Sequence, residues 1–209
     1  MSRFIQISTD EVYGSAPASV SFTENAILDP RSPYAASKAS ADHLVQAYAN
    51  TYSVPTVSFR CTNSFGPFQF PEKLIPLMIA NALEDKPLPL YGDGMQERDW
   101  LFVEDYCRAI AIVLEKAKPG AVYNVSAGTL QLNLKIVRTI LSHLRKPETL
   151  INHVQDRPGH DRRYALTVPK FSANWDGSLS SPLNKGCGEP LTGTGRIHRG
   201  SSMLVRASI

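Results

Sequence analysis

The feature that most constrains the fold is a strand–helix–strand pattern near the amino end of the sequence. Residues 4–8 and 56–60 are short, apolar-rich runs, typical of strands buried in a parallel sheet. Between them, a segment opening near Pro33 and ending near residue 52 has the periodicity of a helix. Its apolar positions follow the spacing of one buried helix face: Ala41, Leu44, Val45, Tyr48 and Tyr52. The pattern predicts a βαβ crossover.

The chain continues to alternate in this manner to about residue 170. Helical patterns lie near residues 72–85, where a proline interrupts the run, and at 103–117 and 133–144; extended segments lie at 100–102 and 122–125. One face of the third helical segment is apolar throughout: Ile136, Val137, Ile140, Leu141 and Leu144. We therefore expect an α/β protein.

Composition excludes several functional classes. Hydrophobic residues make up 43% of the chain and charged residues 20%, as in ordinary globular proteins. No apolar run approaches the roughly 18 residues of a membrane span, and the amino end has no apolar secretory core, so we expect a cytoplasmic protein without a membrane partner. The net charge is +3, and residues 172–209 account for +2 of it, which leaves no basic face for nucleic acid. Cys61, Cys107 and Cys187 lack metal-ligand spacing, so we expect reduced thiols and no metal.

The pair Tyr34 and Lys38 is the strongest chemical motif. A spacing of four places both side chains on one helix face, with the Lys38 ammonium near the Tyr34 hydroxyl. A tyrosine titrates near 10, so it needs nearby positive charge to act as a base near neutrality. Lys38 is expected to supply that charge, although a solvated helix pair has the same pattern.

An acid pair occurs at the end of the first expected strand, in "STDEVYG". Asp10 and Glu11 alone would fit an exposed turn. The carboxyl ends of parallel strands are, however, where α/β folds place their ligands, and the helix bearing Tyr34 and Lys38 follows. We expect the two motifs to face each other.

Six stretches, in order, resemble one family. They are "STDEVYG", "YAASK", "NSFGPFQFPEKLIPL", "PLYGDGMQERDWLFVEDYCRAI", "YNVSAG" and "DRPGHDRRYA". Together they resemble the extended short-chain dehydrogenases/reductases and, among these, the nucleotide-sugar 4,6-dehydratases that act on dTDP-glucose. Within that group, Thr-Asp-Glu is characteristic of dehydratases rather than epimerases. The resemblance implies a partial Rossmann-like half, a doubly wound parallel sheet, plus a smaller α/β substrate-binding domain.

The resemblance also implies a mechanism. The family oxidises the sugar at C4 by hydride transfer to NAD, eliminates water across C5 and C6, and returns the hydride to C6. Tyr34 would take the C4 hydroxyl proton, with Thr9 and Lys38 assisting. Glu11 would remove the C5 proton, and Asp10 would protonate the leaving hydroxyl, a division of roles that a close acid pair in a dry site favours.

Binding roles are implied in the same way. The resemblance assigns the NAD cofactor to Ser8, Tyr34, Lys38 and Asn63. It assigns the nucleotide-sugar substrate, dTDP-glucose, to Asn63, Lys73, Leu74, Pro89, Tyr91, Arg98, Asn133, Arg157 and His160. Arg98 could otherwise form a surface ion pair with Asp99, and His160 could be a turn residue. Family members are usually dimers through helices that include the one bearing "YAASK", so a homodimer is expected of the full-length parent.

The domain boundaries follow from the same comparison. Residues 1–66 would be the carboxyl-terminal part of the NAD-binding domain, with the catalytic residues, and residues 67–171 mainly the substrate domain with interleaved Rossmann elements. Residues 172–209 hold six of the 13 glycines and seven serines, without apolar periodicity, and we expect little order there. Since the family continues with an amphipathic helix, a reading-frame change or unrelated tail near 172–175 is a hypothesis.

One family motif has no match in this sequence. The Gly-x-Gly-x-x-Gly turn that receives the NAD pyrophosphate is missing, which suggests amino-terminal truncation and predicts weak NAD binding and marginal stability of the isolated chain. Three alternatives stay open: an inactive fragment, a non-catalytic nucleotide-sugar-binding module, and a dehydratase or epimerase relative that uses another nucleotide.

Overall fold

A parallel sheet forms the first of two units in the computed structural model, which describes residues 3–170. Its strands are β1 (Phe4–Thr9), β2 (Thr56–Cys61) and β6 (Ala121–Val125), in the order β1-β2-β6. In the parallel register, Thr9 lies beside Cys61, and Cys61 lies beside Val125. The strands therefore end at one edge of the sheet, and the expected βαβ crossover is confirmed.

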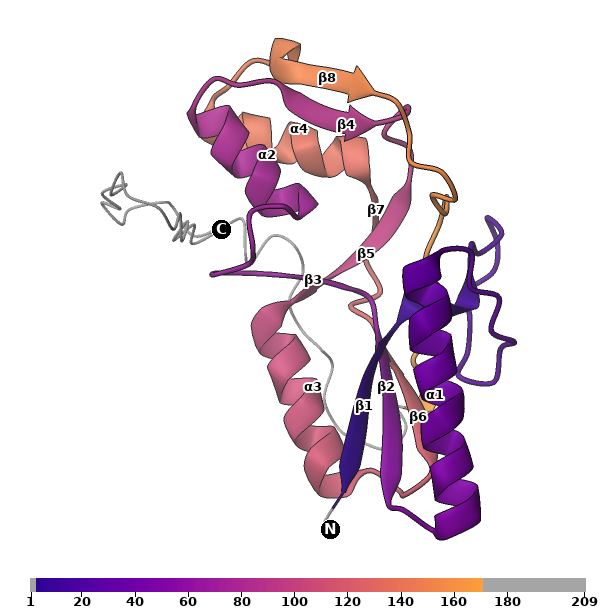
Figure 1. The fold of residues 1–209 in the computed structure, drawn as a ribbon. Coiled ribbons are helices and arrows are strands. Elements are labelled where there is room, and N and C mark those ends of the chain that lie inside the picture. Colours follow the sequence, from indigo (N-terminus) through magenta and orange to yellow (C-terminus); the bar gives the residue numbers. More distant parts are fainter. Residues whose placement is uncertain (1–2, 171–209) are drawn as a thin grey trace.

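Helices cover both faces of this sheet (Figure 1). Helix α1 (Pro33–Tyr52) lies on one side and α3 (Val103–Lys116) on the other. Ala109 and Val113 of α3 pack against Phe59 and other buried side chains of β2 and β6. The first unit is therefore a three-layer α/β sandwich, which agrees with the expected α/β class.

The expected buried face of α1 is wrong. Its buried residues are Ala35, Ala39 and Asp42, whereas the large apolar side chains are exposed: Leu44 61%, Tyr48 55% and Tyr52 69%. Leu44 follows Ala35 by about two and a half turns, so the two lie on opposite sides of the helix. Small side chains on the inner side let α1 approach the sheet closely, and the large ones point away from it.

A second unit is built around α2 (Leu74–Leu83) and α4 (Asn133–Leu144) (Figure 1). Its strands are β3 (Asn63–Phe65), β4 (Leu88–Tyr91), β5 (Glu97–Phe102), β7 (Leu130–Leu132) and β8 (Ile151–Val154). Strands β3, β5 and β7 form one sheet, and β4 pairs with β8 in parallel. The predicted face of α4 is confirmed, with Ile136, Val137, Ile140 and Leu141 buried and Leu144 partly buried against the core.

Sequence patterns missed the shortest elements of this unit. Strands β3 and β7 have three residues each, too few for a period of two to be visible, and Pro89 interrupts the apolar run of β4. The 3₁₀ helices η1 (Asp10–Tyr13) and η2 (Glu148–Leu150) were also missed. Conversely, Pro76 does not interrupt α2, because it lies in the first turn, where no helical hydrogen bond is lost.

A crossing segment, residues 155–170, returns from the second unit to the first. The backbone amides of Ala16 and Phe22 donate to the carbonyls of Arg163 and Ala165, each at 2.9 Å, and Thr167 N donates to Phe22 O at 2.9 Å. Within residues 3–170 no helix is long and apolar enough to span a membrane. The expectation of little order beyond residue 171 falls outside the described residues.

Candidate active site

The acid pair lies directly after β1, at the edge where the parallel strands end. Thr9 caps the 3₁₀ helix η1: its Oγ1 accepts from the Glu11 amide at 3.3 Å and donates to Asp10 Oδ1 at 3.2 Å. Asp10 is only 3% exposed, and its Oδ2 is buried without a hydrogen-bond partner among residues 3–170. The turn that sequence alone would place in solvent is therefore folded inward.

Burial gives the two carboxyl groups unusual acidities. It raises the pKa of Asp10 to about 7; the Glu11 carboxylate adds to this rise, while Arg98 opposes it. Burial also raises the pKa of Glu11, against the lowering effect of the Arg98 and Arg157 charges. Near neutral pH, Asp10 is therefore partly protonated, as a proton donor must be.

Arg98 and Tyr164 lie next to the acid pair. The Arg98 guanidinium lies 4.1 Å from the centre of the Tyr164 ring and donates to the Asp161 carbonyl at 2.7 Å. The Tyr164 hydroxyl donates to Asp161 Oδ2 at 2.9 Å and lies 3.5 Å from Glu11 Oε2. These contacts bring the crossing segment to the acid pair.

The alternative role of Arg98 as half of a surface ion pair is wrong. Its side chain is buried, with 5% exposed, and makes no ion pair with Asp99 within the described residues. Asp99 instead accepts from Ser126 Oγ and from the amides of Gly128 at 3.0 Å and Thr129 at 2.9 Å. Asp99 thus fixes the turn after β6, and the Arg98 charge is directed to the site.

Tyr34 and Lys38 lie on α1 beside the acid pair. The Tyr34 side chain is about half exposed, and its pKa is raised, first by burial and then by Glu11, Cys61 and Asp10. Lys38 Nζ donates to the Ile7 carbonyl of β1 at 3.0 Å rather than to Tyr34. The expectation that Lys38 lowers the Tyr34 pKa is therefore not met in this structure: the Tyr34 pKa is raised.

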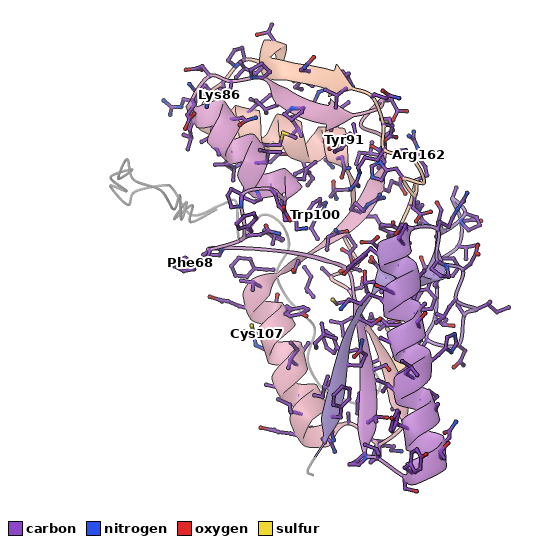
Figure 2. The ribbon with its side chains drawn as sticks, in the orientation of Figure 1. Phe68, Lys86, Tyr91, Trp100, Cys107 and Arg162 are labelled. Atoms are coloured by element: carbon purple, nitrogen blue, oxygen red, sulfur yellow. The ribbon has the colours of Figure 1, made fainter. Side chains whose placement is uncertain are left out.

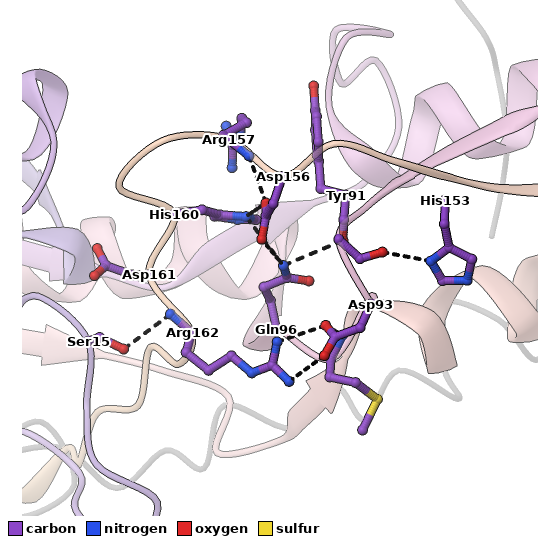
Figure 3. Close-up of polar contacts among 12 residues, drawn as sticks. Ser15, Tyr91, Asp93, Gln96, His153, Asp156, Arg157, His160, Asp161 and Arg162 are labelled. Atoms are coloured by element: carbon purple, nitrogen blue, oxygen red, sulfur yellow. Dashed lines mark hydrogen bonds and ion pairs between the residues drawn. The ribbon is translucent and has the colours of Figure 1, made fainter.

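A second cluster joins three predicted substrate residues, Tyr91, Arg157 and His160 (Figure 3). The Arg157 guanidinium lies 5.1 Å from the centre of the Tyr91 ring, and the His160 ring meets the same ring edge-on at 6.2 Å. Asp156 and Gln96, which sequence reasoning missed, hold this cluster together. Tyr91 and Arg162 mark its place at the junction of the two units (Figure 2).

The remaining predicted binding residues are more dispersed. Lys73 is exposed and pairs with Glu72 at 3.1 Å, and Leu74 packs on the core of the second unit. Asn63 and Asn133 each have a buried side-chain oxygen without a hydrogen-bond partner among the described residues, as does Ser8 Oγ. Pro89 lies within β4. Asn133 contacts the second cluster through its backbone N–H, which donates to the Gln96 carbonyl at 2.9 Å.

The residues that were missed lie inside stretches already singled out. Asp156, Asp161 and Tyr164 belong to "DRPGHDRRYA", and Gln96 belongs to "GDGMQERDW". The sequence therefore marked the stretches that contain these residues, but only the folded structure shows which of their polar side chains point inward. No group of three or more His, Cys, Asp or Glu suited to a metal ion occurs in residues 3–170.

The fold and the site together indicate the class of protein. A parallel sheet carries an acid pair at its strand ends, and the helix that connects β1 with β2 carries Tyr34 and Lys38. The chain belongs to the family described as GDP-mannose 4,6 dehydratase, whose model matches residues 1–177. More particularly, it is similar to dTDP-glucose 4,6-dehydratases: 53% identical to that of Neisseria meningitidis over 181 residues, and 50% to that of Xanthomonas campestris over 178. Each match covers 81% of this chain and 51% of the relative, so the chain spans about half the length of these curated relatives.

Solved structures of similar fold include the same class of enzyme. The dTDP-glucose 4,6-dehydratase of Bacillus anthracis, in complex with NAD, has a TM-score of 0.86 and 47% identity, covering 90% of this chain and 60% of that one. The Streptomyces venezuelae enzyme, with NAD and TYD bound, has a TM-score of 0.82 and 42% identity, with coverages of 86% and 55%. A UDP-glucuronic acid 4-epimerase of Bacillus cereus has a TM-score of 0.83 and 32% identity, with coverages of 88% and 59%. The fold is the Rossmann-like α/β fold of these enzymes.

Proposed function

We propose that this chain carries the catalytic centre of an NAD-dependent 4,6-dehydratase that converts dTDP-glucose to dTDP-4-keto-6-deoxyglucose. The observation that carries the proposal is the acid pair. Asp10, with its pKa raised to about 7, can hold a proton at neutral pH, while Glu11 reaches the Tyr164 hydroxyl beside the cationic Arg98. Elimination of water needs one acid and one base at adjacent positions, and these two residues meet that need.

The residues at the sheet edge fit the nicotinamide part of NAD. Ser8 Oγ and Asn63 Oδ1 are buried and have no hydrogen-bond partner within residues 3–170, and Tyr34, whose side chain is about half exposed, lies in the field of the acid pair. Ser8, Tyr34, Lys38 and Asn63 are the proposed holders of the cofactor. When bound, NAD would accept the C4 hydride and return it to C6.

Each of the predicted catalytic residues at the sheet edge has a proposed part in the proton transfers. Tyr34 accepts the C4 hydroxyl proton, and the Thr9 hydroxyl forms a hydrogen bond near the same atom. The C4 ketone acidifies the C5 proton, which Glu11 removes. Asp10 gives its proton to the departing C6 hydroxyl, so that water leaves. Burial, followed by the charges of Glu11, Cys61 and Asp10, raises the pKa of Tyr34, so deprotonation of Tyr34 requires added positive charge near its hydroxyl, which an oxidised nicotinamide would supply when bound.

The second cluster is the proposed nucleoside diphosphate site. Arg157 and His160 supply donors for phosphate oxygens, and the exposed Tyr91 ring supplies an apolar face for a base. Arg98, Asn133, Lys73, Leu74, Pro89 and Asn63 complete the proposed substrate set. For the whole protein, the proposal includes a homodimer formed through α1. The exposed Leu44, Tyr48 and Tyr52 of this helix offer an apolar surface for that contact.

A chimaera tests the proposed function. Residues 1–177 of this chain replace the matching segment of the Neisseria meningitidis dehydratase, and dTDP-glucose is followed by mass spectrometry and NMR. We expect loss of one water and a C4 ketone, with kcat reduced at least about 100-fold by Glu11→Gln. Epimerised product alone, or turnover of only UDP-, GDP- or CDP-glucose, would contradict the dehydratase or its nucleotide. Binding of dTDP without turnover would favour a binding module.

A further inference from the structure

Gln96 is a buried side chain at which two segments of the second unit and the crossing segment meet (Figure 3). It is 1% exposed, immediately before β5. Its backbone carbonyl accepts from the Asn133 amide at 2.9 Å. Its side-chain nitrogen lies 2.9 Å from Asp156 Oδ2, 3.5 Å from the Tyr91 carbonyl and 3.4 Å from His160 Nδ1. Each of the three segments thus carries a proposed substrate residue.

The Asp156 carboxylate is held from two sides. Oδ2 accepts from Gln96, while Oδ1 accepts from the Arg157 amide at 2.8 Å and lies 2.6 Å from His160 Nδ1. Burial acts to raise the pKa of Asp156, but the bonds from His160, Arg157 and Gln96 lower it overall, so the group is ionised. Since a carboxylate only accepts, His160 Nδ1 carries the hydrogen of this bond.

Close packing against Gly92 limits the positions open to Asp156. Gly92 has φ +56°, and a Cβ built there would lie 2.9 Å from Asp156 Oδ2. The carboxylate therefore fits between a glycine turn and the Gln96 amide. From this fixed point, Arg157 is directed over the Tyr91 ring.

The chemistry of the amide is informative. Gln96 Oε1 is buried without a hydrogen-bond partner among residues 3–170, and burying such an oxygen is unfavourable. An apolar side chain of similar size would pack there without that cost, so packing alone does not account for a glutamine. Its nitrogen is a neutral donor, which fixes Asp156 without adding charge beside Arg157 and His160.

We propose that Gln96 is a positioning residue, which orients Arg157 and His160 toward a nucleoside diphosphate by holding the Asp156 carboxylate. This inference rests on the proposed function, because it concerns the same nucleotide site. Gln96 acts through Asp156 and does not touch the substrate.

Binding of dTDP to the full 209-residue chain gives the first test. Isothermal titration calorimetry compares the wild type with Gln96→Leu and the nearly isosteric Gln96→Glu. We expect each change to weaken binding at least about tenfold, because a hydrogen bond to a charged group is lost or replaced by repulsion. The matched control is Gln155→Leu, since Gln155 is exposed and has no side-chain hydrogen bond among the described residues. Its affinity should equal that of the wild type.

The ligand-free His160 titration gives a readout that general loss of stability would not change. The groups facing His160 are Asp156, Arg157, Arg98, Gln96 and the Tyr91 ring. Burial lowers the His160 pKa; the Arg157 and Arg98 charges act the same way, and Asp156 opposes them. Gln96→Glu adds a carboxylate beside the imidazole, so we expect the NMR midpoint to rise.

The outcomes separate the two proposals. If the wild type does not bind dTDP, the proposed function fails, and the His160 midpoint still decides the role of Gln96. If the wild type binds dTDP while folded Gln96→Leu and Gln96→Glu bind equally well, the inference is overturned. Circular dichroism establishes folding, and if Gln96→Leu is unfolded, Gln96→Glu alone decides. An unchanged His160 midpoint in Gln96→Glu also overturns the inference.

Discussion

At the scale of single residues, Asp10 and Glu11 show that adjacent carboxyl groups can have different environments. The Thr9 cap turns the chain so that Asp10 is buried while Glu11 reaches the Tyr164 hydroxyl on the crossing segment. Sequence reasoning selected this acid pair as well as Tyr34 and Lys38, because a strand end and the spacing of a motif are local features of the sequence. It did not select Gln96, Asp156 or Tyr164, because their roles depend on contacts between distant segments.

The raised pKa of Asp10 predicts a basic limb in the activity of the chimaera. Asp10 donates a proton, so kcat should fall about tenfold per pH unit above a midpoint near the Asp10 pKa of about 7. On the acidic side, the raised pKa of Glu11 sets the limb on which the base becomes protonated. A pH–rate profile from 5 to 9 measures both. A kcat that stays constant to pH 9 would exclude Asp10 as the proton donor.

Asp10 also predicts how stability depends on pH. Its folded-state pKa of about 7 exceeds the ordinary 3.8, so the folded state prefers the protonated form and loses stability as pH rises between these values. The full shift corresponds to about 4 kcal/mol. Asp10→Asn should therefore raise the unfolding midpoint more at pH 8 than at pH 5, measured by thermal denaturation. An equal change at both pH values would contradict burial of a charge at this position.

At the scale of elements, α1 shows the limit of hydrophobic periodicity. The pattern correctly predicts a helix over residues 33–52, yet it assigns the buried side to the large apolar residues. Burial instead follows Ala35 and Ala39, together with Asp42, whose carboxylate meets Arg60 of β2 at 2.7 Å. Periodicity identifies an apolar face, but not the surface that covers it. For α4, which has one apolar face and one neighbouring core, the same reasoning succeeds.

The Asp42–Arg60 pair predicts a strong effect of substitution on stability. Arg60 also donates to the Tyr13 hydroxyl at 2.8 Å, so the pair joins α1, β2 and the turn after β1. Arg60→Leu leaves the Asp42 charge buried and unpaired, and should lower the free energy of unfolding by about 3–5 kcal/mol.

The exposed pair Arg138–Glu148 is the matched control for this change. Its side chains are more than half exposed, so Arg138→Leu should cost less than about 1 kcal/mol. Urea denaturation of both variants measures the difference. Equal costs would show that the Asp42–Arg60 pair is not a buried ion pair in the folded protein.

At the scale of the whole molecule, the two units meet around the candidate site. The three-stranded sheet presents its strand ends, the second unit contributes Tyr91 and Gln96, and the crossing segment contributes Asp156 to the same cluster and Tyr164 to the acid pair. Sequence alternation predicts the α/β class, since the longer helices and the buried strands of the first unit each leave a local pattern. It does not predict that residues 163–167 return to residues 16–22, because that pairing leaves no local pattern.

The exposed side of α1 predicts self-association. Leu44 and Tyr48 should be covered by the same helix of a second copy, so the 23.0 kDa chain should have about twice its monomer mass in light scattering after size exclusion. Leu44→Glu should give monomers. Leu114→Glu on α3, at a leucine of similar exposure, should leave the mass unchanged. A monomeric wild type, or dimers of Leu44→Glu, would contradict the α1 interface.

The return of the crossing segment also governs when the first unit can close during synthesis. Arg163 bonds to the carbonyl of Pro17, 146 positions earlier, and Thr167 bonds to that of Phe22. Residues 16–22 therefore cannot form these hydrogen bonds until residues 163–167, and with them most of the described chain, have left the ribosome. In that interval the β1–β2 pair and α1 can form, while the side that later receives the crossing segment stays open to chaperones and proteases.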